Sequence, residues 1–142
     1  MDTNSLQRGM DESPAIANMG LTVQLLDQNT GCVVIRMPSA AHTERVAGMG
    51  QYHGGPIALL IDVAGDAAIA IHLDGWVPTI NLRVDYLRPC TGAYLDATAT
   101  LRRRGRSIGV VDIDVHDEEG RLCAIGRGTY STIVDQKLPS QD

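Results

Sequence analysis

Apolar and polar residues alternate along most of the second half of the chain. After Trp76 every second residue is apolar over three stretches, the residues between them are mostly Thr, Asp and Arg, and a last run of strand-forming residues follows at 122–133. This two-residue period is typical of strands with one buried face. The intervening segments, at 89–92, near Gly105 and at 117–120, are short enough for antiparallel hairpins. The pattern predicts four antiparallel strands, at about residues 79–86, 95–102, 111–116 and 122–133.

Two shorter runs of strand-forming residues, at 21–26 and 32–37, lie nearer the N-terminus. The turn-forming residues between them include Asn29 and Gly31, so the two runs are expected to form a hairpin. Residues 39–52 show neither a strand nor a helix period and are expected to form a loop.

Residues 56–73 form an apolar stretch that is too long for a typical strand and therefore predicts a helix. Pro56 suits its first position, and Asp74 with Gly75 gives a stop signal. The stretch is apolar on nearly every side, so the helix is expected to be buried on nearly every side. One such helix and about six strands bury their faces only if an antiparallel sheet curls around the helix, which is an α+β fold.

The chain has 142 residues, of which 44% are hydrophobic, and this favours one globular domain. We expect a flexible N-terminal segment at residues 1–14, a single domain at 15–135 and a polar C-terminal tail at 136–142.

The net charge of −5 argues against nucleic acid and anionic membrane surfaces as general partners. Residues 1–15 contain four charged side chains and no apolar core, so no signal peptide is expected. Asp62 and Asp66 interrupt the long apolar stretch, and each would cost about 2.5–3.5 kcal/mol at the centre of a bilayer. A membrane span is therefore not expected.

The three cysteines, Cys32, Cys90 and Cys123, are odd in number and widely spaced. This pattern predicts neither a disulfide framework nor a zinc site. We interpret them as reduced thiols of a cytoplasmic protein, and we expect neither a metal nor a cofactor.

Asp62 and Asp66 are the most informative residues of the apolar stretch. They lie four positions apart on one helix face, and the sequence has no Lys or Arg between Arg45 and Arg83 to pair with them locally. One interpretation is a thin solvent-facing stripe. The other is a carboxylate at a cleft, with a pKa raised by burial and by its neighbour, suited to act as a general base or nucleophile.

His53, Gly54 and Gly55 immediately precede this stretch. Two glycines let backbone N–H groups approach a ligand at the positive end of the helix dipole, where they can polarise a carbonyl. Asp62 follows about two turns later, roughly 10 Å along the axis, so a substrate bridging two subunits could use both. Alternatively, the glycines form only a tight turn, and His53 satisfies backbone groups instead of acting as a base.

Four arginines lie within residues 102–106 and are followed by Ser107. Arginine side chains match the geometry of phosphate groups, and like charges this close favour a bound anion. The alternative is a solvated end of a hairpin.

The run from His53 to Ala64 resembles the signature of hotdog-fold thioesterases of the PaaI or 4-hydroxybenzoyl-CoA thioesterase type. In these proteins a His-Gly-Gly turn precedes a central helix that carries Asp or Glu nine residues after the histidine, and Asp62 meets this spacing. The resemblance extends over about residues 20–133. It implies a hotdog fold, an acyl-CoA thioester substrate, and dimers that often pair into tetramers with the active site between subunits.

The resemblance also implies roles for individual residues. Asp62 would attack the thioester or activate water, and the Gly54 N–H would hold the thioester oxygen. Asp66 and Thr79 occupy positions that resemble orienting side chains. The predicted site therefore comprises the candidate catalytic residues Asp62, Gly54, His53, Asp66 and Thr79, and the candidate phosphate-binding residues Arg103, Arg104, Arg106 and Ser107.

Two departures from the family pattern keep other functions open. Ala47 stands where many members have Asn or Gln, with Glu44 as a possible substitute if the loop is longer, and Asp66 stands where a hydroxyl residue is common. The alternative is a non-catalytic protein that binds acyl-CoA or an acyl carrier. A hotdog dehydratase ranks last, because the sequence lacks a turn of the His-Phe-Pro-Gly type.

Overall fold

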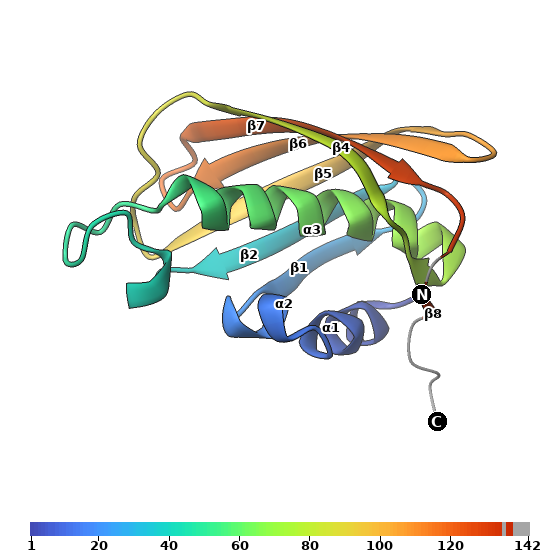
Figure 1. Ribbon diagram of the computed structural model, residues 1–142, viewed down its shortest axis with the longest axis horizontal. Coiled ribbons are helices and arrows are strands. Elements are labelled where there is room, and N and C mark those ends of the chain that lie inside the picture. Colours follow the sequence, from blue (N-terminus) through green and yellow to red (C-terminus); the bar gives the residue numbers. More distant parts are fainter. Residues whose placement is uncertain (135, 138–142) are drawn as a thin grey trace.

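The computed structural model describes residues 1–134 and the backbone of residues 136 and 137. One long helix lies across the concave face of a curved antiparallel sheet (Figure 1). The helices are α1 (Thr3–Asp11), α2 (Pro14–Asn18) and α3 (Gly54–Leu73), with a single 3₁₀ turn at Ala41–Thr43. The strands are β1 (Thr22–Asp27), β2 (Cys32–Pro38), β3 (Gly75–Trp76), β4 (Thr79–Tyr86), β5 (Tyr94–Arg104), β6 (Ile108–Asp117), β7 (Leu122–Ser131) and β8 (Gln136–Lys137).

The main sheet has six strands in the order β1-β2-β5-β6-β7-β4, with antiparallel neighbours throughout. The predicted hairpin of β1 and β2 and the four later strands are all confirmed. Periodicity does not predict the order of the strands in the sheet. β5, β6 and β7 are neighbours in the order of the sequence, but β4 lies beyond β7 at the edge and β2 pairs with β5. β3 and β8 form a separate short pair.

The core lies between α3 and the sheet. Alternate residues of β5 and β6, such as Ala97, Val111 and Ile113, pack with α3 residues such as Leu60 and Ile69. By length and composition α3 could cross a membrane, but here it is the central core helix, and 61% of its most apolar window is buried. The α+β fold with a helix wrapped by a six-stranded sheet is confirmed, and it is the hotdog arrangement that the resemblance implies.

The helix begins two residues earlier than expected. Gly54 is its first residue, and the imidazole of His53 caps it by accepting a hydrogen bond from the Gly55 amide at 2.9 Å. It ends as predicted at Asp74, which adopts a left-handed conformation with φ of 52°.

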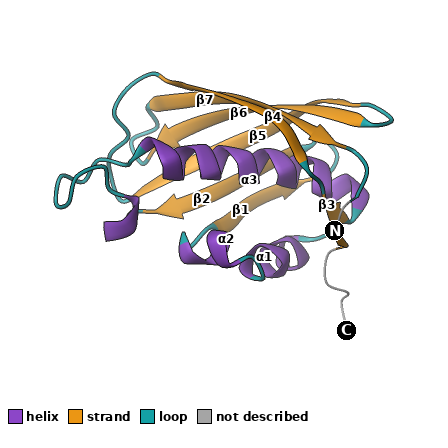
Figure 2. Ribbon diagram, in the orientation of Figure 1, coloured by secondary structure: helices purple, strands orange, loops and turns teal. Residues whose placement is uncertain are grey.

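The structure corrects the interpretation of residues 1–14. They contain α1, in which Leu6 and Met10 are fully buried against the core. Asp2 caps this helix by accepting a hydrogen bond from the Ser5 amide at 2.8 Å. α1 and α2 lie beside β1 (Figure 2), so this sheet edge is covered. In the predicted tail at 136–142, residues 136 and 137 form β8, and residues 138–142 lie outside the described part.

β4 forms the opposite edge and remains exposed. Ile80 and Tyr86 belong to the apolar set that the alternation predicts to be buried, yet they are 56% and 51% exposed. The reason is that, among the described residues, β4 has only one neighbouring strand, β7, and no helix lies beside its outer edge. An exposed edge with apolar side chains can pair with another chain.

Candidate functional site

The candidate catalytic carboxylates lie on the one stripe of α3 that the sheet leaves partly open. Between residues 57 and 71 every residue is buried except Ala58, Leu59, Asp62 and Asp66. These four are spaced by one, three and four positions, so they share one face of the helix. The stripe is apolar at its beginning and acidic further along, beside the segment that leads into β4.

Asp62 is half-buried and has one neutral hydrogen-bond donor. The Thr79 hydroxyl, at the start of β4, donates to Asp62 Oδ1 at 2.8 Å. Burial raises the pKa of Asp62, and the hydrogen bond from Thr79 partly opposes this rise. No cation within residues 1–134 forms an ion pair with this carboxylate. A carboxylate with a raised pKa and no counter-ion is a better proton acceptor than an exposed carboxylate.

Asp66 lies one turn further along and is more deeply buried. The backbone amide of Val77 donates to its Oδ1 at 3.3 Å. Burial raises the pKa of Asp66 to about 8, the charge of Asp62 adds to the rise, and the Val77 amide opposes it. The structure therefore brings the carboxylates of Asp62 and Asp66 and the hydroxyl of Thr79 to one part of the molecule.

Tyr130, on β7, contacts the backbone of α3 next to Asp62, and the sequence did not predict a role for it. Its hydroxyl donates to the backbone carbonyl of Asp62 at 3.2 Å. A Cβ atom on either Gly65 or Gly128 would overlap the Tyr130 side chain, so both glycines make room for it. Burial, with the charges of Asp62 and Asp66, raises the pKa of Tyr130, which keeps its hydroxyl protonated as a donor. The only sequence signal was a glycine inside the helix and another inside a strand.

The turn before α3 has a second anchor that sequence reasoning missed. The Tyr86 hydroxyl, at the end of β4, donates to the Gly54 carbonyl at 2.6 Å. A Cβ atom at Gly54 would lie 3.1 Å from the Tyr86 hydroxyl oxygen, so glycine suits this position. The observed role of His53 is to cap the helix, which agrees with the structural alternative for this residue.

β4 thus connects to α3 at two places. Its first residue, Thr79, contacts Asp62, and its last residue, Tyr86, contacts Gly54. Gly54 and Asp62 themselves are eight positions apart, about 12 Å along the helix axis. One thioester carbonyl is too small to reach both within a single chain.

A cavity of about 380 Å³ lies next to Gly54 at the N-terminal end of α3. Ile57 and Tyr52 contribute to its apolar wall, and Arg45 and Arg88 contribute charge. Asp62 does not line it. The cavity can hold part of a ligand whose reactive group lies further along the stripe.

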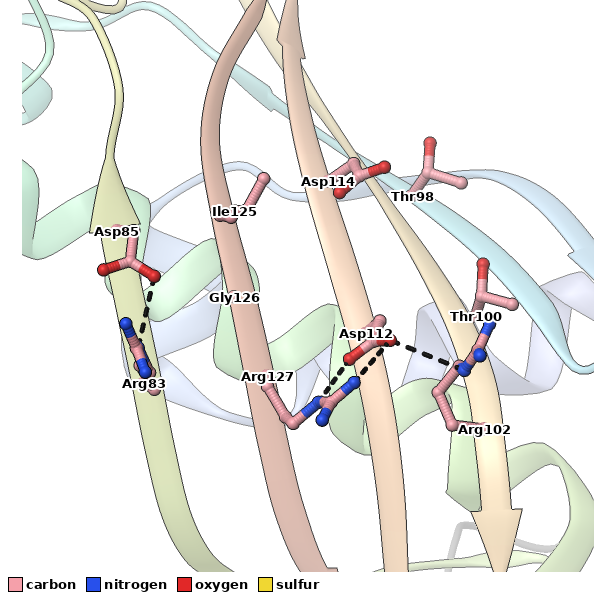
Figure 3. A pocket seen from close by; sticks show the side chains of 10 residues that line it. All are labelled: Arg83, Asp85, Thr98, Thr100, Arg102, Asp112, Asp114, Ile125, Gly126 and Arg127. Atoms are coloured by element: carbon pink, nitrogen blue, oxygen red, sulfur yellow. Dashed lines mark hydrogen bonds and ion pairs between the residues drawn. The ribbon is translucent and has the colours of Figure 1, made fainter.

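A second hollow, of about 490 Å³, lies on the outer face of the sheet (Figure 3). It is separated from α3 by the sheet itself. Three arginines and three aspartates line it, and Asp112 forms ion pairs with Arg127 at 2.6 Å and Arg102 at 3.5 Å. These opposite charges largely cancel, so this hollow is a weak candidate for an anion site.

The four arginines of the turn at 102–106 do not all lie in the same environment. Arg102 joins the outer network through Asp112, whereas Arg103, Arg104 and Arg106 are exposed and form no ion pair with any described residue. Arg104 Nη1 lies 3.5 Å from the carbonyl of His72, which places the turn at the C-terminal end of α3. The three arginines and the exposed Ser107 are thus free to contact an anion, but at the end of the helix away from Gly54.

Glu44 interacts within its own loop. Its Oε2 accepts a hydrogen bond from the Gly48 amide at 2.5 Å, and Ala47 beside it is exposed. Within the described part of the chain, no three His, Cys, Asp or Glu side chains form a group that could hold a metal ion.

Comparison with known proteins gives the family. The profile of the Thioesterase superfamily matches residues 49–124, which include α3 and β4 to β6. Acyl-coenzyme A thioesterase PaaI of Escherichia coli is 30% identical over 121 residues, covering 84% of this chain and 71% of PaaI. Medium/long-chain acyl-CoA thioesterase YigI of Escherichia coli is 36% identical over 93 residues, covering 55% of this chain and 60% of YigI.

Solved structures agree. A thioesterase of Haemophilus influenzae superposes with a TM-score of 0.81 at 26% identity, covering 92% of this chain and 90% of that one. Escherichia coli PaaI superposes with a TM-score of 0.78 at 26% identity, covering 95% and 98%. The chain belongs to the Thioesterase superfamily and is a thioester hydrolase of the PaaI-like hotdog type.

The hydrogen bond from Thr79 gives a first testable prediction. Replacing Thr79 by Val removes the donor that stabilises the ionised form of Asp62, so we expect the pKa of Asp62 to rise. Titration of its side-chain carboxyl carbon by NMR measures this shift. Thr79→Ser keeps a hydroxyl and should leave the midpoint close to that of the wild type. An unchanged midpoint in Thr79→Val would show that the hydrogen bond does not act on Asp62.

Proposed function

We propose that this protein is a cytoplasmic acyl-CoA thioesterase that hydrolyses a small or medium acyl- or aroyl-CoA thioester at Asp62. The observation that carries the proposal is a half-buried carboxylate with a raised pKa and no counter-ion within the described residues, on the one partly open stripe of α3 between residues 57 and 71. Keeping such a charge there costs stability, which a functional role explains. The names of PaaI and YigI, both acyl-CoA thioesterases, support this substrate class.

In the proposed reaction Asp62 acts on the thioester carbonyl, either directly or through a water molecule from which it takes a proton. In the water route, a C–O bond to water forms, the C–S bond breaks, and coenzyme A leaves as the thiolate. In the direct route, the same C–S bond breaks as an anhydride forms on Asp62, and water then hydrolyses the anhydride to release the acid and restore the carboxylate. The Gly54 N–H, at the positive end of the α3 dipole, stabilises the developing oxyanion. His53 holds Gly54 in place through its cap, and Thr79 orients the carboxylate.

We further propose that two copies pair through β4 and complete the site. When β4 of one copy pairs with β4 of a second copy across a twofold axis, the two strands run antiparallel. The Thr79 end of one strand then lies beside the Tyr86 end of the other. Because these ends contact Asp62 and Gly54, the pairing brings Asp62 of one copy toward Gly54 of the second copy. Within one chain, Gly54 and Asp62 are about 12 Å apart along the helix axis. In the paired copies, Gly54 of one copy lies nearer to Asp62 of the other.

The nucleotide of coenzyme A is proposed to lie against Arg103, Arg104, Arg106 and Ser107. His72, beside this turn, is ten positions beyond Asp62, about 15 Å along the helix axis. In acyl-CoA, the pantetheine arm likewise separates the thioester from the phosphates, so the thioester can lie at Asp62 while the phosphates lie at the arginine turn. The unpaired guanidinium groups supply the charge that an acidic protein otherwise lacks for an anionic substrate.

The role of Asp62 is tested by Asp62→Asn against a panel of acyl- and aroyl-CoA thioesters. We expect kcat to fall by at least about 100-fold, the usual contribution of a general base. Calorimetry should show unchanged binding of a non-hydrolysable thioether analogue. Asp114→Asn, on the outer face of the sheet, is the matched control and should keep full activity. Tight binding with no turnover in the wild type would instead establish the non-catalytic binding protein.

Pairing through β4 is tested by Ile80→Lys, which places a charge on the exposed edge. We expect sedimentation to show monomers and the activity to be lost although Asp62 is unchanged. Leu25→Lys makes the same kind of change on β1, at the opposite edge, where Leu25 is 47% exposed. This control should remain associated and active. A fully active monomeric Ile80→Lys variant would contradict a site shared between copies.

The phosphate site is tested by comparing two substrates that differ only in the nucleotide. In the double variant Arg104→Ala, Arg106→Ala, we expect KM for acyl-CoA to rise roughly tenfold or more, since a hydrogen bond to a charged group contributes about 1.5 kcal/mol. KM for the acyl-pantetheine thioester, which lacks the nucleotide, should not change. Arg8→Ala, on α1, serves as the control. Equal effects on both substrates would place the phosphates elsewhere.

A further inference from the structure

Asp66 and Asp62 form an acidic pair that the described part of the chain leaves without a cation. Each carboxylate receives one hydrogen bond from a neutral donor, the Thr79 hydroxyl for Asp62 and the Val77 amide for Asp66. The other titratable group that faces them is Tyr130, from β7, and its hydroxyl donates to the backbone carbonyl of Asp62. The pair lies on the half-buried stripe, where water screens charge poorly.

Burial of Asp66 is the main cause that favours a neutral carboxyl group here, and the negative charge of Asp62 one helical turn away adds to it. The surroundings of the two carboxyl groups differ. Asp62 has the charge-stabilising hydroxyl of Thr79, whereas Asp66 is more deeply buried and accepts only a longer bond from an amide. These surroundings favour the neutral form of Asp66 more strongly than the neutral form of Asp62.

We propose that Asp66 is a positioning residue that works as a neutral carboxylic acid, donating a hydrogen bond to the Asp62 carboxylate or to the water that Asp62 activates. Its Oδ1 accepts from the Val77 amide, which leaves Oδ2 to carry the proton. In this form Asp66 supplies the same kind of donor as a hydroxyl side chain. No bond to the substrate is made or broken by Asp66. The inference rests on the proposed function of Asp62.

The arrangement has a consequence for activity at alkaline pH. The pKa of Asp66 is raised to about 8, so above this pH it loses its proton. The donor then becomes a second negative charge beside Asp62, and turnover should fall with a single ionisation.

A parallel consequence concerns stability. An unfolded Asp has a pKa of about 3.9, so between about pH 4 and about pH 8 the folded protein holds a proton that the unfolded chain has released. The linkage between proton binding and folding then makes stability fall as the pH rises through this window.

The experiment uses Asp66→Asn, which cannot ionise but keeps both a donor and an acceptor of the same shape. We expect kcat/KM near pH 7 within a few-fold of the wild type, and we expect the alkaline limb near pH 8 to disappear. Asp66→Ala lacks the donor and should lose about tenfold in kcat/KM, corresponding to one hydrogen bond to a charged group. Asp114→Asn, exposed on β6, should leave the wild-type profile unchanged.

Two results would overturn the proposal. One is an alkaline limb that persists in Asp66→Asn, and the other is an Asp66→Asn variant as inactive as Asp66→Ala at every pH. Thermal unfolding gives a readout independent of turnover, because the wild type should lose Tm between pH 5 and pH 9 and Asp66→Asn should lose less. If no substrate of the panel is hydrolysed, the proposed function and the positioning role both fail. The unfolding data still decide whether Asp66 holds the proton.

Discussion

A single curved sheet cannot enclose an apolar helix completely, because the sheet has two edges and the helix has a full circumference. Six strands cover most of α3, and α1 and α2 cover the β1 edge. The remaining gap lies beside β4, and the two carboxylates of α3 occupy it. Buried elsewhere on this helix, either charge would lack water on every side. The geometry of wrapping therefore determines where an acid can be kept on this helix, and the proposed function uses this position.

The period of the sequence gave the six strands and the helix, because each has enough residues for a repeat to be visible. α1 escaped detection since only Leu6 and Met10 contribute to the core, and two apolar residues among polar ones do not establish a period. The sequence predicts the start of α3 two residues too late, because Pro56 suits the first position of a helix. The His53 cap, a contact between a side chain and the backbone, moves the start to Gly54. Strand order depends on contacts between segments distant in sequence, which periodicity does not report.

For the candidate site, the sequence reveals residues whose charge differs from that of the residues around them. Asp62 is an acid in an apolar helix, and the four arginines at 102–106 are concentrated in an acidic protein, so the sequence alone singles out both. Tyr86 and Tyr130 fit the alternation of their strands, so the sequence does not distinguish them from other strand residues. Their importance arises from what the hydroxyl groups reach, the Gly54 and Asp62 carbonyls, and that is a property of the folded chain alone.

The supports of the acid and the walls of the cavity near Gly54 belong to different parts of the molecule. Asp62 is held by the central helix, by the first residue of β4 and by a tyrosine that reaches across from β7. The cavity is lined largely by two connecting segments, around Arg45 to Tyr52 and Leu87 to Cys90. Connecting segments tolerate insertions and substitutions far better than packed elements do. On the proposed function, an acyl group held in this cavity would contact residues that can change by insertion and substitution, while the carboxylate remains fixed by the helix and the sheet.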